Sequence, residues 1–310
     1  MANVLRTSWD ESTAQVVFKP GYIKQVFDNT ARDAYTEWKD LFKDVKTDKR
    51  YEDHFRYAGL GAMSEIAEGQ TIPTSEPLYG GTKRFTQKEY ALGFRITWMM
   101  KKTNQMDMVK RNTASLRKNM EEGKDIEVMK VWNNTTSTTY ASGFDGYALA
   151  YNTHSTLDPD GQTYDNYLDS NLSTSSLESA LAYFDAVYDD RGDIFPVVPT
   201  KLIVNYNNRV TASQILKSDG DPHTLSNDIN AYKEEWDLKP FVSRRITSST
   251  FWALTADPGN EDYGPRVVTL QAPDLTVQDA PDTSKDTVVL SHQAFAYGFT
   301  DPRLIYVGDT

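Results

Sequence analysis

The sequence predicts an α+β protein, because patterns typical of helices and patterns typical of strands occupy separate stretches of the chain. In the first 135 residues, two helical patterns flank a stretch that alternates on the strand period. Beyond residue 135 the chain mixes short apolar runs with further helical patterns. A length of 310 residues allows two domains, or one core with large extensions.

Residues 1–50 are predicted to form an N-terminal arm with a helix. Pro20 opens a run in which apolar side chains recur at steps of three and four, so we expect a helix over Gly21–Lys46. Because little chain precedes this helix, its apolar face must pack on the body of the same subunit or on a neighbour. The candidate intersubunit contacts in this stretch are Arg32, Trp38 and Phe42.

Residues 51–101 are predicted to form a long β-hairpin. Strand-like alternation runs over Glu65–Ile72 and Arg84–Met99, and a cluster of prolines and glycines separates the two stretches. Arms of ~15 residues at ~3.3 Å each would reach about 50 Å. An isolated hairpin of that length is barely stable in water, so it needs a surface to lie against. The candidate intersubunit contacts at its tip are Pro73, Pro77, Tyr79, Lys83, Arg84 and Phe85.

Residues 102–135 are predicted to hold one long helix, over Asn104–Trp132, and the start of the next unit. Apolar side chains at helical spacing make one stripe along it, and at ~1.5 Å per residue the helix would be about 40 Å long. These side chains are Met106, Val109, Thr113, Leu116 and Met120.

The rest of the chain divides into residues 136–270 and 271–310, both of mixed helix and strand. A helix capped by Ser173 or Thr174 is expected, and a second over residues 207–217. The apolar runs predict strands over 201–205, 241–246, 251–254, 267–270 and 287–290, with a final alternating run over 295–299 and 304–307.

Composition excludes several classes of protein. Lys and Arg number 33 against 44 Asp and Glu, a net charge of -11, which is too acidic for a general nucleic-acid binder. The absence of cysteine excludes disulfides, thiolate metal sites and cysteine nucleophiles. No apolar run approaches the ~18–20 residues of a membrane helix, and the first residues lack a signal-peptide core, so no membrane partner is expected. Residues 1–130 hold 22 basic and 19 acidic side chains, whereas residues 131–310 hold 11 and 25.

No motif in the sequence indicates catalysis, a cofactor or a metal site. Phosphate-loop and nucleophile-elbow patterns are absent, and acidic residues interrupt the basic ones of the long helix, which predicts a solvated face. A fragment of a calcium loop at Asp158, Asp160 and Asp165 is broken by Pro159 and predicts a turn. The histidines are too far apart in sequence for a metal motif, and they are His54, His154, His223 and His292.

The order of these elements resembles the major capsid protein of tailed bacteriophages, which has the Hong Kong 97 fold. The segment EGQTIPTSEPLYGGTKRFTQKEYALGFRIT is similar to the E-loop hairpin of that family, and the helix at 104–132 is similar to its spine helix. PTKLIVNYNNRVTASQIL resembles the central strand and helix of the A-domain, and FAYGFTDPRLIYVGD the returning P-domain strands. The resemblance thus implies an N-arm, an E-loop, a spine helix, a P-domain and an A-domain.

The resemblance also implies a function and partners. The chain would self-assemble through hexamers and pentamers into the icosahedral head that encloses the double-stranded DNA genome, and it would reside in the virion after assembly in the host cytoplasm. A separate scaffolding protein, a portal protein and non-specific contact with packaged DNA follow, while a cement or decoration protein is left open. Because only about sixty residues precede the hairpin, we expect no amino-terminal trimming. Isopeptide cross-linking through Lys83 or Lys88 is not expected, because no sequence rule selects a partner asparagine.

Two other functions stay open from the sequence. An encapsulin-type nanocompartment shell has the same fold but encloses cargo proteins. A carbohydrate-binding or hydrolytic protein would use the 18 tyrosines and 6 tryptophans to line a cleft, and it would be a monomer or a small oligomer.

Overall fold

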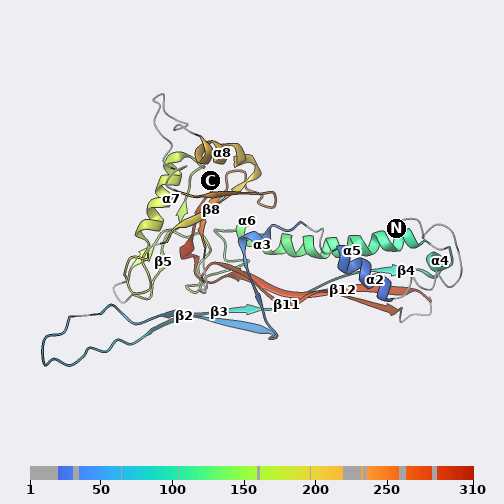
Figure 1. Cartoon of the computed structure of the whole chain (residues 1–310), viewed down its shortest axis with the longest axis horizontal. Coiled ribbons are helices and arrows are strands. Elements are labelled where there is room, and N and C mark those ends of the chain that lie inside the picture. Colours follow the sequence, from blue (N-terminus) through green and yellow to red (C-terminus); the bar gives the residue numbers. More distant parts are fainter. Residues whose placement is uncertain are drawn as a thin grey trace.

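The molecule is elongated, with a body at one end, a long helix-covered sheet toward the other, and a hairpin that projects beyond the body (Figure 1). A computed structural model describes residues 20–30, 35–63, 65–103, 105–158, 161–195, 197–218, 232, 236–257, 263–280 and 285–310. None of the helices in these ranges is long and apolar enough to cross a membrane.

A four-stranded sheet forms the long part of the molecule. Its strand order is β1 (Lys43–Lys46), β11 (Pro265–Asp279), β12 (Thr287–Phe299) and β4 (Lys88–Ile96). The pairs β11–β12 and β12–β4 are antiparallel, and β1 runs parallel to β11.

Two helices cover one face of this sheet. Helix α5 (Met106–Val128) runs along it and α2 (Pro20–Thr30) packs beside α5 (Figure 1). The apolar stripe of α5 explains this packing, because its buried members share a core with side chains of α2 and of the sheet. That core contains Ile23, Phe27, Ile96, Val109, Leu116, Met120, Leu275 and Val289. The short helix α4 (Trp98–Lys102) follows β4, and Thr97 caps it by accepting a hydrogen bond from Met100 N at 3.2 Å.

A five-stranded sheet forms the body. Its order is β7 (Tyr167–Leu168), β13 (Ile305–Gly308), β10 (Trp252–Ala256), β8 (Pro199–Asn205) and β9 (Lys239–Ser243). Helices α7 (Thr174–Ala186) and α8 (Arg209–Lys217) pack on one face, where Leu202 and Leu254 are buried. The other face meets the end of the long helix, where α6 (Lys130–Asn133) places Trp132 against Phe251.

Smaller elements complete the body. They are the helix α3 (Trp38–Leu41), the two-residue strands β5 (His154–Ser155) and β6 (Thr163–Tyr164), and the 3₁₀ turns Tyr206–Asn208 and Pro302–Leu304.

The projecting hairpin is a separate two-stranded sheet. Strands β2 (Tyr51–Ala58) and β3 (Leu78–Thr86) pair antiparallel, from Tyr51 opposite Thr86 to Ala58 opposite Leu78. Residues 59–77 connect them as a long loop at the far end (Figure 1).

The predicted helix over Gly21–Lys46 is wrong in its second half. Helix α2 ends at Thr30, α3 is a single turn, and residues 43–46 form strand β1. The chain turns extended at Phe42, with φ −127° and ψ 143°, because β1 pairs with β11 and packs Val45 against the buried Phe85 cluster. A tertiary pairing has therefore overridden a local helical pattern.

The hairpin is real, but its strands were predicted in the wrong places. The predicted strand Glu65–Ile72 is wrong, because those described residues lie in the connecting loop, whereas the actual partner of β3 is Tyr51–Ala58. The predicted strand Arg84–Met99 is also divided: its first residues belong to β3, and Lys88–Ile96 pairs with β12 in the other sheet. Alternation reveals which face a residue takes and does not reveal which strand lies beside it.

Most other predicted elements are confirmed. The long helix is α5 with α6 following it, although it ends at Val128 rather than at Trp132. Ser173 caps α7 by accepting a hydrogen bond from Ser176 N at 3.1 Å. Strands β8, β10 and β13 and helix α8 lie within two residues of the predicted ranges. Strand β9 ends at Ser243 and overlaps only the first half of its predicted range, and the runs predicted at 287–290 and 295–299 belong to the single strand β12. Strand β11 is longer than expected and spans the predicted boundary between residues 270 and 271.

Two glycines give a matched test of this packing. A Cβ at Gly308 would lie 2.1 Å from the buried Trp252 ring, whose Nε1 is already held by Ser170 O at 2.9 Å. At Gly123, in α5, a Cβ would meet nothing within 4 Å. We predict that Gly308→Ala lowers the free energy of unfolding by about 1–3 kcal/mol, and that Gly123→Ala raises it by about 0.5–1 kcal/mol. Urea denaturation of both variants measures the two changes in the free energy of unfolding. Changes of equal size and sign would contradict the packing described.

Candidate intersubunit surface

A buried ion network fixes the base of the hairpin to the body. Arg56, on β2, donates to both carboxylate oxygens of Asp190, at 2.5 and 3.2 Å, and to Ser155 O at 2.8 Å. Arg303 donates to the same Asp190 at 2.7 Å and lies 3.3 Å from Asp301. All four charged side chains are at least nine-tenths buried, so each charge depends on its partners for stabilisation.

The network sets the charge state of Asp190. Burial alone would raise the pKa of Asp190, but the neighbouring Arg303 and Arg56 outweigh it and hold that pKa below its usual value. Asp190 is therefore an anion at neutral pH and forms charged pairs with both arginines.

The next residue, Arg191, holds the two legs of the hairpin loop together. Its guanidinium donates to Gly59 O at 3.1 Å and to Glu76 O at 2.5 Å, one carbonyl on each leg. Just beyond, Gly61 N donates to Ser75 Oγ at 3.0 Å. The loop is therefore closed at its stem, and the residues past Gly61 extend from a fixed base.

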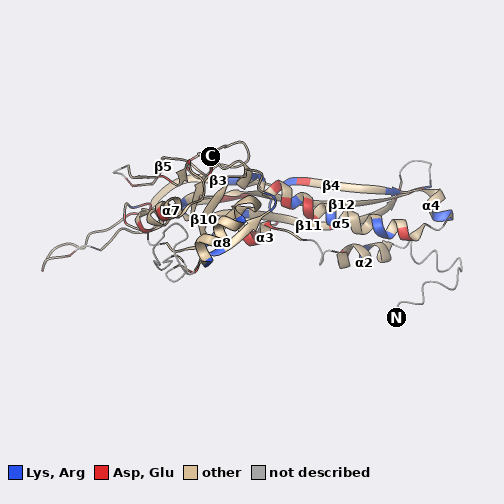
Figure 2. Ribbon diagram, turned by 90° about the horizontal axis from the view of Figure 1, so that it is seen from above, with Lys and Arg blue, Asp and Glu red and all other residues tan. Residues whose placement is uncertain are grey.

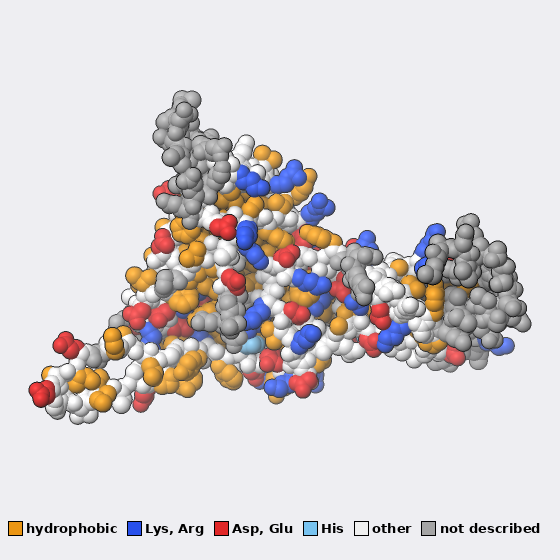
Figure 3. Space-filling view, in the orientation of Figure 1, with side chains coloured by type: hydrophobic (Ala, Val, Ile, Leu, Met, Phe, Trp, Pro, Cys, Tyr) orange, Lys and Arg blue, Asp and Glu red, His pale blue; other side chains and the backbone are white. Residues whose placement is uncertain are grey.

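The hairpin exposes large apolar side chains, both on its paired strands and in its loop, which we call the hairpin patch. Met63 is 100% exposed and Tyr79 is 73% exposed. The other members are Phe55, Tyr57, Leu60, Ile66 and Ile72. Apolar side chains gather along this arm in the space-filling view (Figure 3). A contiguous apolar surface on a projecting arm is typical of a protein–protein contact.

The predicted contact residues of the hairpin divide between surface and interior. Pro73, Tyr79 and Arg84 are exposed, and Arg84 pairs with Asp53 at 2.7 Å within the hairpin. Lys83 is half-buried, and burial lowers the pKa of its ammonium, which donates to Ser142 Oγ at 3.1 Å. Pro77 is half-buried and Phe85 is buried with Val268 and Ala296.

The predicted contacts of the N-terminal stretch lie inside the chain's own core. Trp38 and Phe42 pack with Trp132, and Lys124 Nζ lies 4.2 Å from the Trp38 ring centroid. Arg32 lies outside the described residues. Sequence reasoning missed Phe55, Tyr57, Leu60 and Met63, although the alternation of aromatic and polar residues over Tyr51–Ala58 is a strand signal that could have found the first two.

The histidines take structural positions among the residues described. His154 is buried and pairs with Asp145 at 2.6 Å, and His292 lies 3.1 Å from Glu89 on the sheet surface. His54 Nδ1 lies 3.1 Å from Arg266, and His223 lies outside the described residues. The described part of the chain contains no group of three or more His, Asp or Glu that could hold a metal ion.

At the predicted Asp158 turn, Gly161 N donates to Asp158 O at 3.0 Å, and Pro159 lies outside the described residues. Asp160, in the same segment, lies outside the described residues.

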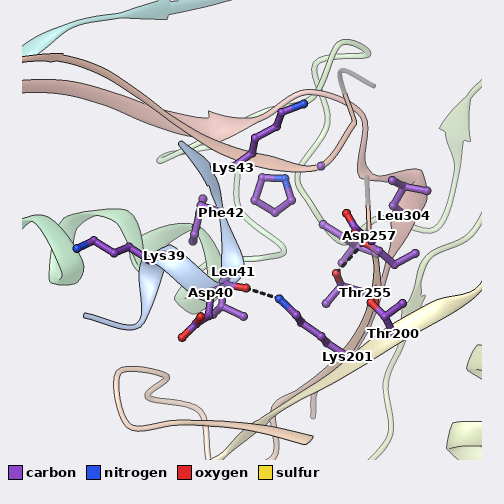
Figure 4. Close-up of a pocket in the computed structure, with 14 residues that line it drawn as sticks. Lys39, Asp40, Leu41, Phe42, Lys43, Thr200, Lys201, Thr255, Asp257 and Leu304 are labelled. Atoms are coloured by element: carbon purple, nitrogen blue, oxygen red, sulfur yellow. Dashed lines mark hydrogen bonds between the residues drawn. The ribbon is translucent and has the colours of Figure 1, made fainter. Parts of the chain in front are cut away.

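A pocket of about 280 Å³ lies where the N-terminal stretch meets the body (Figure 4). Its wall contains Phe42 and Leu304, and Lys201 reaches across to donate to Asp40 O at 2.6 Å. Among the described residues, lysines, threonines and aspartates line it beside apolar side chains. The hydrogen bond from Lys201 anchors α3 to strand β8.

A model of the phage capsid protein family matches residues 80–308, and the chain therefore belongs to that family. The match begins within β3 and covers α5, the body, and three of the four strands of the long sheet, whereas α2, β1, β2 and the hairpin loop precede it. No match was found among curated protein sequences.

Solved structures share the fold at low sequence identity. The capsid of cyanophage P-SCSP1u matches with a TM-score of 0.56 and 9% identity, over 89% of this chain and 88% of that chain. The virus-like particle from Pyrococcus furiosus matches with a TM-score of 0.52 and 11% identity, over 93% and 98%. A structure from Microbacterium phage Oxtober96 matches with a TM-score of 0.52 and 11% identity, over 88% of this chain and 91% of that chain.

The chain thus has the Hong Kong 97-like fold, and its family makes it a self-assembling shell protein of the phage capsid. Membership of that family implies a structural role rather than an enzymatic one.

Removing the carboxylate at the centre of the network tests its role. Asp190→Asn leaves two buried arginines short of a counter-charge, so we predict a loss of about 3–5 kcal/mol in the free energy of unfolding at pH 7. Because the folded pKa of Asp190 is lowered, its contribution is complete above the unfolded value of about 4 and is lost as pH falls through the folded pKa. Denaturation of the unaltered chain and of Asp190→Asn should be measured from neutral to acid pH. The difference between their free energies of unfolding should narrow only below about pH 4.

Removing the stem contact tests the role of Arg191. Its side chain is only half-buried and its acceptors are neutral backbone carbonyls, so Arg191→Ala should change global stability by less than about 1 kcal/mol. The same change should make the loop at residues 59–77 more sensitive to protease, because both legs lose a shared donor. Limited proteolysis measures this, with Arg84→Ala as the control that breaks an exposed contact elsewhere in the hairpin. Equal cleavage of the two variants would contradict the assigned role.

Proposed function

We propose that this chain is the major capsid protein of a tailed phage, and that it assembles through hexamers and pentamers into an icosahedral head around a double-stranded DNA genome. The observation that carries the proposal is the hairpin patch, which projects beyond the body and is not covered by the described part of its own chain (Figure 3).

The energetics favour a neighbour as the cover for this patch. Burying one large apolar side chain contributes about 1.5–3 kcal/mol, so even a few of them stabilise an interface substantially. A two-stranded sheet is marginally stable alone, and the ion network secures only its base. Contact with a second copy would supply the missing packing along the arm.

The geometry of such a contact favours closed rings. A hairpin that reaches a different surface of the next copy makes a heterologous contact, and repeated rotation closes such contacts into rings. Rings of five and six subunits can tile a closed shell, which is the arrangement proposed here.

The proposed partners follow from this function. They are other copies of the chain, a separate scaffolding protein during assembly in the host cytoplasm, a portal protein, and packaged DNA in non-specific contact. The acid excess of residues 131–310 would keep DNA from adhering to the wall if that region faced the genome. Isopeptide cross-linking is not proposed, because Lys83 is half-buried and donates a hydrogen bond to Ser142 Oγ of its own chain.

An encapsulin-type shell is the second candidate, because it shares the fold. The phage capsid family match favours the phage role over this one. The contents of purified particles separate the two candidates, since a phage head would package DNA and a nanocompartment would package a protein cargo. The carbohydrate-binding or hydrolytic role gains no support from the family match.

Electron microscopy of the expressed protein tests the proposed assembly directly. We expect rings or shells from the unaltered chain. Replacing Leu60, Met63 and Ile72 together by serine should reduce the assembled fraction at least ~10-fold, because the loss of even one such buried contact is worth about a factor of ten. The variant should keep the circular dichroism spectrum of the unaltered chain, since all three side chains are exposed. A compact monomer whose hairpin is folded back onto its own body would overturn the proposal.

A further inference from the structure

We infer that a groove between helix α8 and strand β9 binds an acidic peptide segment of another protein, one that carries aliphatic side chains between its carboxylates. The inference goes beyond the proposed function, because it concerns a surface of the body and a partner other than a copy of this chain. It rests on the shape of the groove, on its apolar floor and on the basic side chains around that floor.

The groove consists of two adjoining hollows. One, of about 660 Å³, lies between α8 and β9. The other, of about 300 Å³, lies toward Tyr206, which precedes α8 in the chain. Arg209 and Val242 line both hollows and therefore mark the place where the two meet. We call the two hollows together the basic groove.

The register of the sheet places the apolar floor of the groove. Val242 lies opposite Val204 of β8, and the Val204 side chain is buried in the core that includes α8. Pro240 stands two residues earlier on β9, so it takes the same face of the sheet as Val242. Strand β9 is the last strand of its sheet among the described residues. The floor is therefore an apolar margin of the body beside α8.

Helix α8 supplies the wall of the groove. Its inner face is buried, whereas Val210, Gln214 and Lys217 recur at steps of three and four on the exposed face that lines the groove. Val210 is 57% exposed, and Val242 on the floor is half-buried. These side chains leave apolar surface that the aliphatic side chains of a peptide would cover.

Basic side chains surround this apolar surface. Arg209, Lys217 and Arg244 are exposed, and the structure shows no ion pair for them among the described residues. The described residues that line the two hollows include no aspartate or glutamate. Residues 131–310 hold only 11 basic side chains against 25 acidic ones, so this grouping runs against the charge of its region. Figure 3 shows basic side chains beside apolar ones over α8. The groove therefore attracts an acidic partner.

Two acids near the groove already have local partners. Glu37 is buried, and it accepts hydrogen bonds from Ser243 Oγ at 2.5 Å and from Arg244 N at 3.0 Å. Asp237 lies 3.9 Å from Lys239 at the start of β9. Because Glu37 binds the backbone amide of Arg244, the guanidinium of that residue can still pair with the carboxylate of a partner.

The lining favours a peptide over a nucleic acid. Single-stranded nucleic acid binds where aromatic rings are open to base stacking. Here the guanidinium of Arg209 lies 5.0 Å from the centroid of the Tyr206 ring and covers one face of it. An apolar floor with cations around it buries aliphatic side chains while the cations pair with carboxylates. Pro240 has no N–H and blunts the strand edge, so side-chain contacts rather than an added strand carry the binding.

Binding of a defined peptide tests the inference. The probe is a fluorescein-labelled synthetic peptide in which glutamate alternates with leucine, and fluorescence anisotropy measures its affinity for the purified full chain. Arg209→Glu with Lys217→Glu should weaken binding at least ~10-fold at physiological salt, because attractive charge contacts become repulsive. The same variant should bind the corresponding lysine–leucine peptide at least ~10-fold more tightly than the unaltered chain does.

A matched control separates the groove from a general effect of charge. Lys88→Glu with Lys102→Glu makes the same change in net charge at exposed positions of β4 and α4, and affinity for the glutamate–leucine peptide should stay within about threefold. Val210→Ser leaves the charge unchanged and should weaken binding by about threefold to tenfold, because one apolar contact is lost. Each variant should keep the circular dichroism spectrum of the unaltered chain.

Several results would overturn the inference. They are no measurable binding of the glutamate–leucine peptide by the unaltered chain, or an equal loss of affinity in the groove variant and in the control. Binding of a single-stranded DNA oligonucleotide in place of the peptide, lost in the groove variant, would assign the groove to nucleic acid instead. An oligomer of the unaltered chain that the groove variant fails to form would assign it to a second copy. None of these peptide or DNA results bears on the hairpin patch, so the proposed function is tested separately.

Discussion

The structure depends on one constraint: a hairpin is fixed rigidly at its base, while its far end has no apolar partner in the described part of its own chain. The Arg56–Asp190–Arg303 network fixes the base of the hairpin. The apolar side chains of the hairpin patch remain exposed to solvent in the single chain. A buried ion pair costs desolvation and serves poorly as a source of stability. The role of the Arg56–Asp190–Arg303 network is to fix the orientation of the hairpin relative to the body.

The remainder of the fold supports that arm. The long antiparallel pair β11–β12 and helix α5 form a stiff platform, and the same β12 pairs with β4, which follows β3 directly in sequence. The hairpin therefore begins from a covered sheet and ends in solvent. Asp125 on α5 adds a second anchor by accepting hydrogen bonds from Glu37 N and Trp38 N at 2.9 Å each, which attaches the N-terminal stretch to the platform.

A molecule of this shape exposes different surfaces at its two ends. The exposed apolar side chains of the hairpin patch lie toward one end of the long axis, and α4, with its exposed Trp98 and Met99, lies at the other end (Figures 1 and 2). Burial of the hairpin patch requires a partner outside the chain, because the described part of the chain leaves these side chains exposed.

The sequence by itself determined the α+β class, the order of the elements and the long helix, because apolar spacing is a local property that each segment carries alone. It also determined that a hairpin precedes that helix and that charge is unevenly distributed along the chain. Only the tertiary structure decided that Tyr51–Ala58 pairs with β3, that Lys88–Ile96 pairs with β12, and that residues 43–46 leave the helix. The fold decides which distant segments meet, and strand pairing and ion pairs depend on those meetings. Arg56 and Asp190, for example, are 134 residues apart. The periodicity of apolar residues within one segment does not indicate which other segment lies beside it.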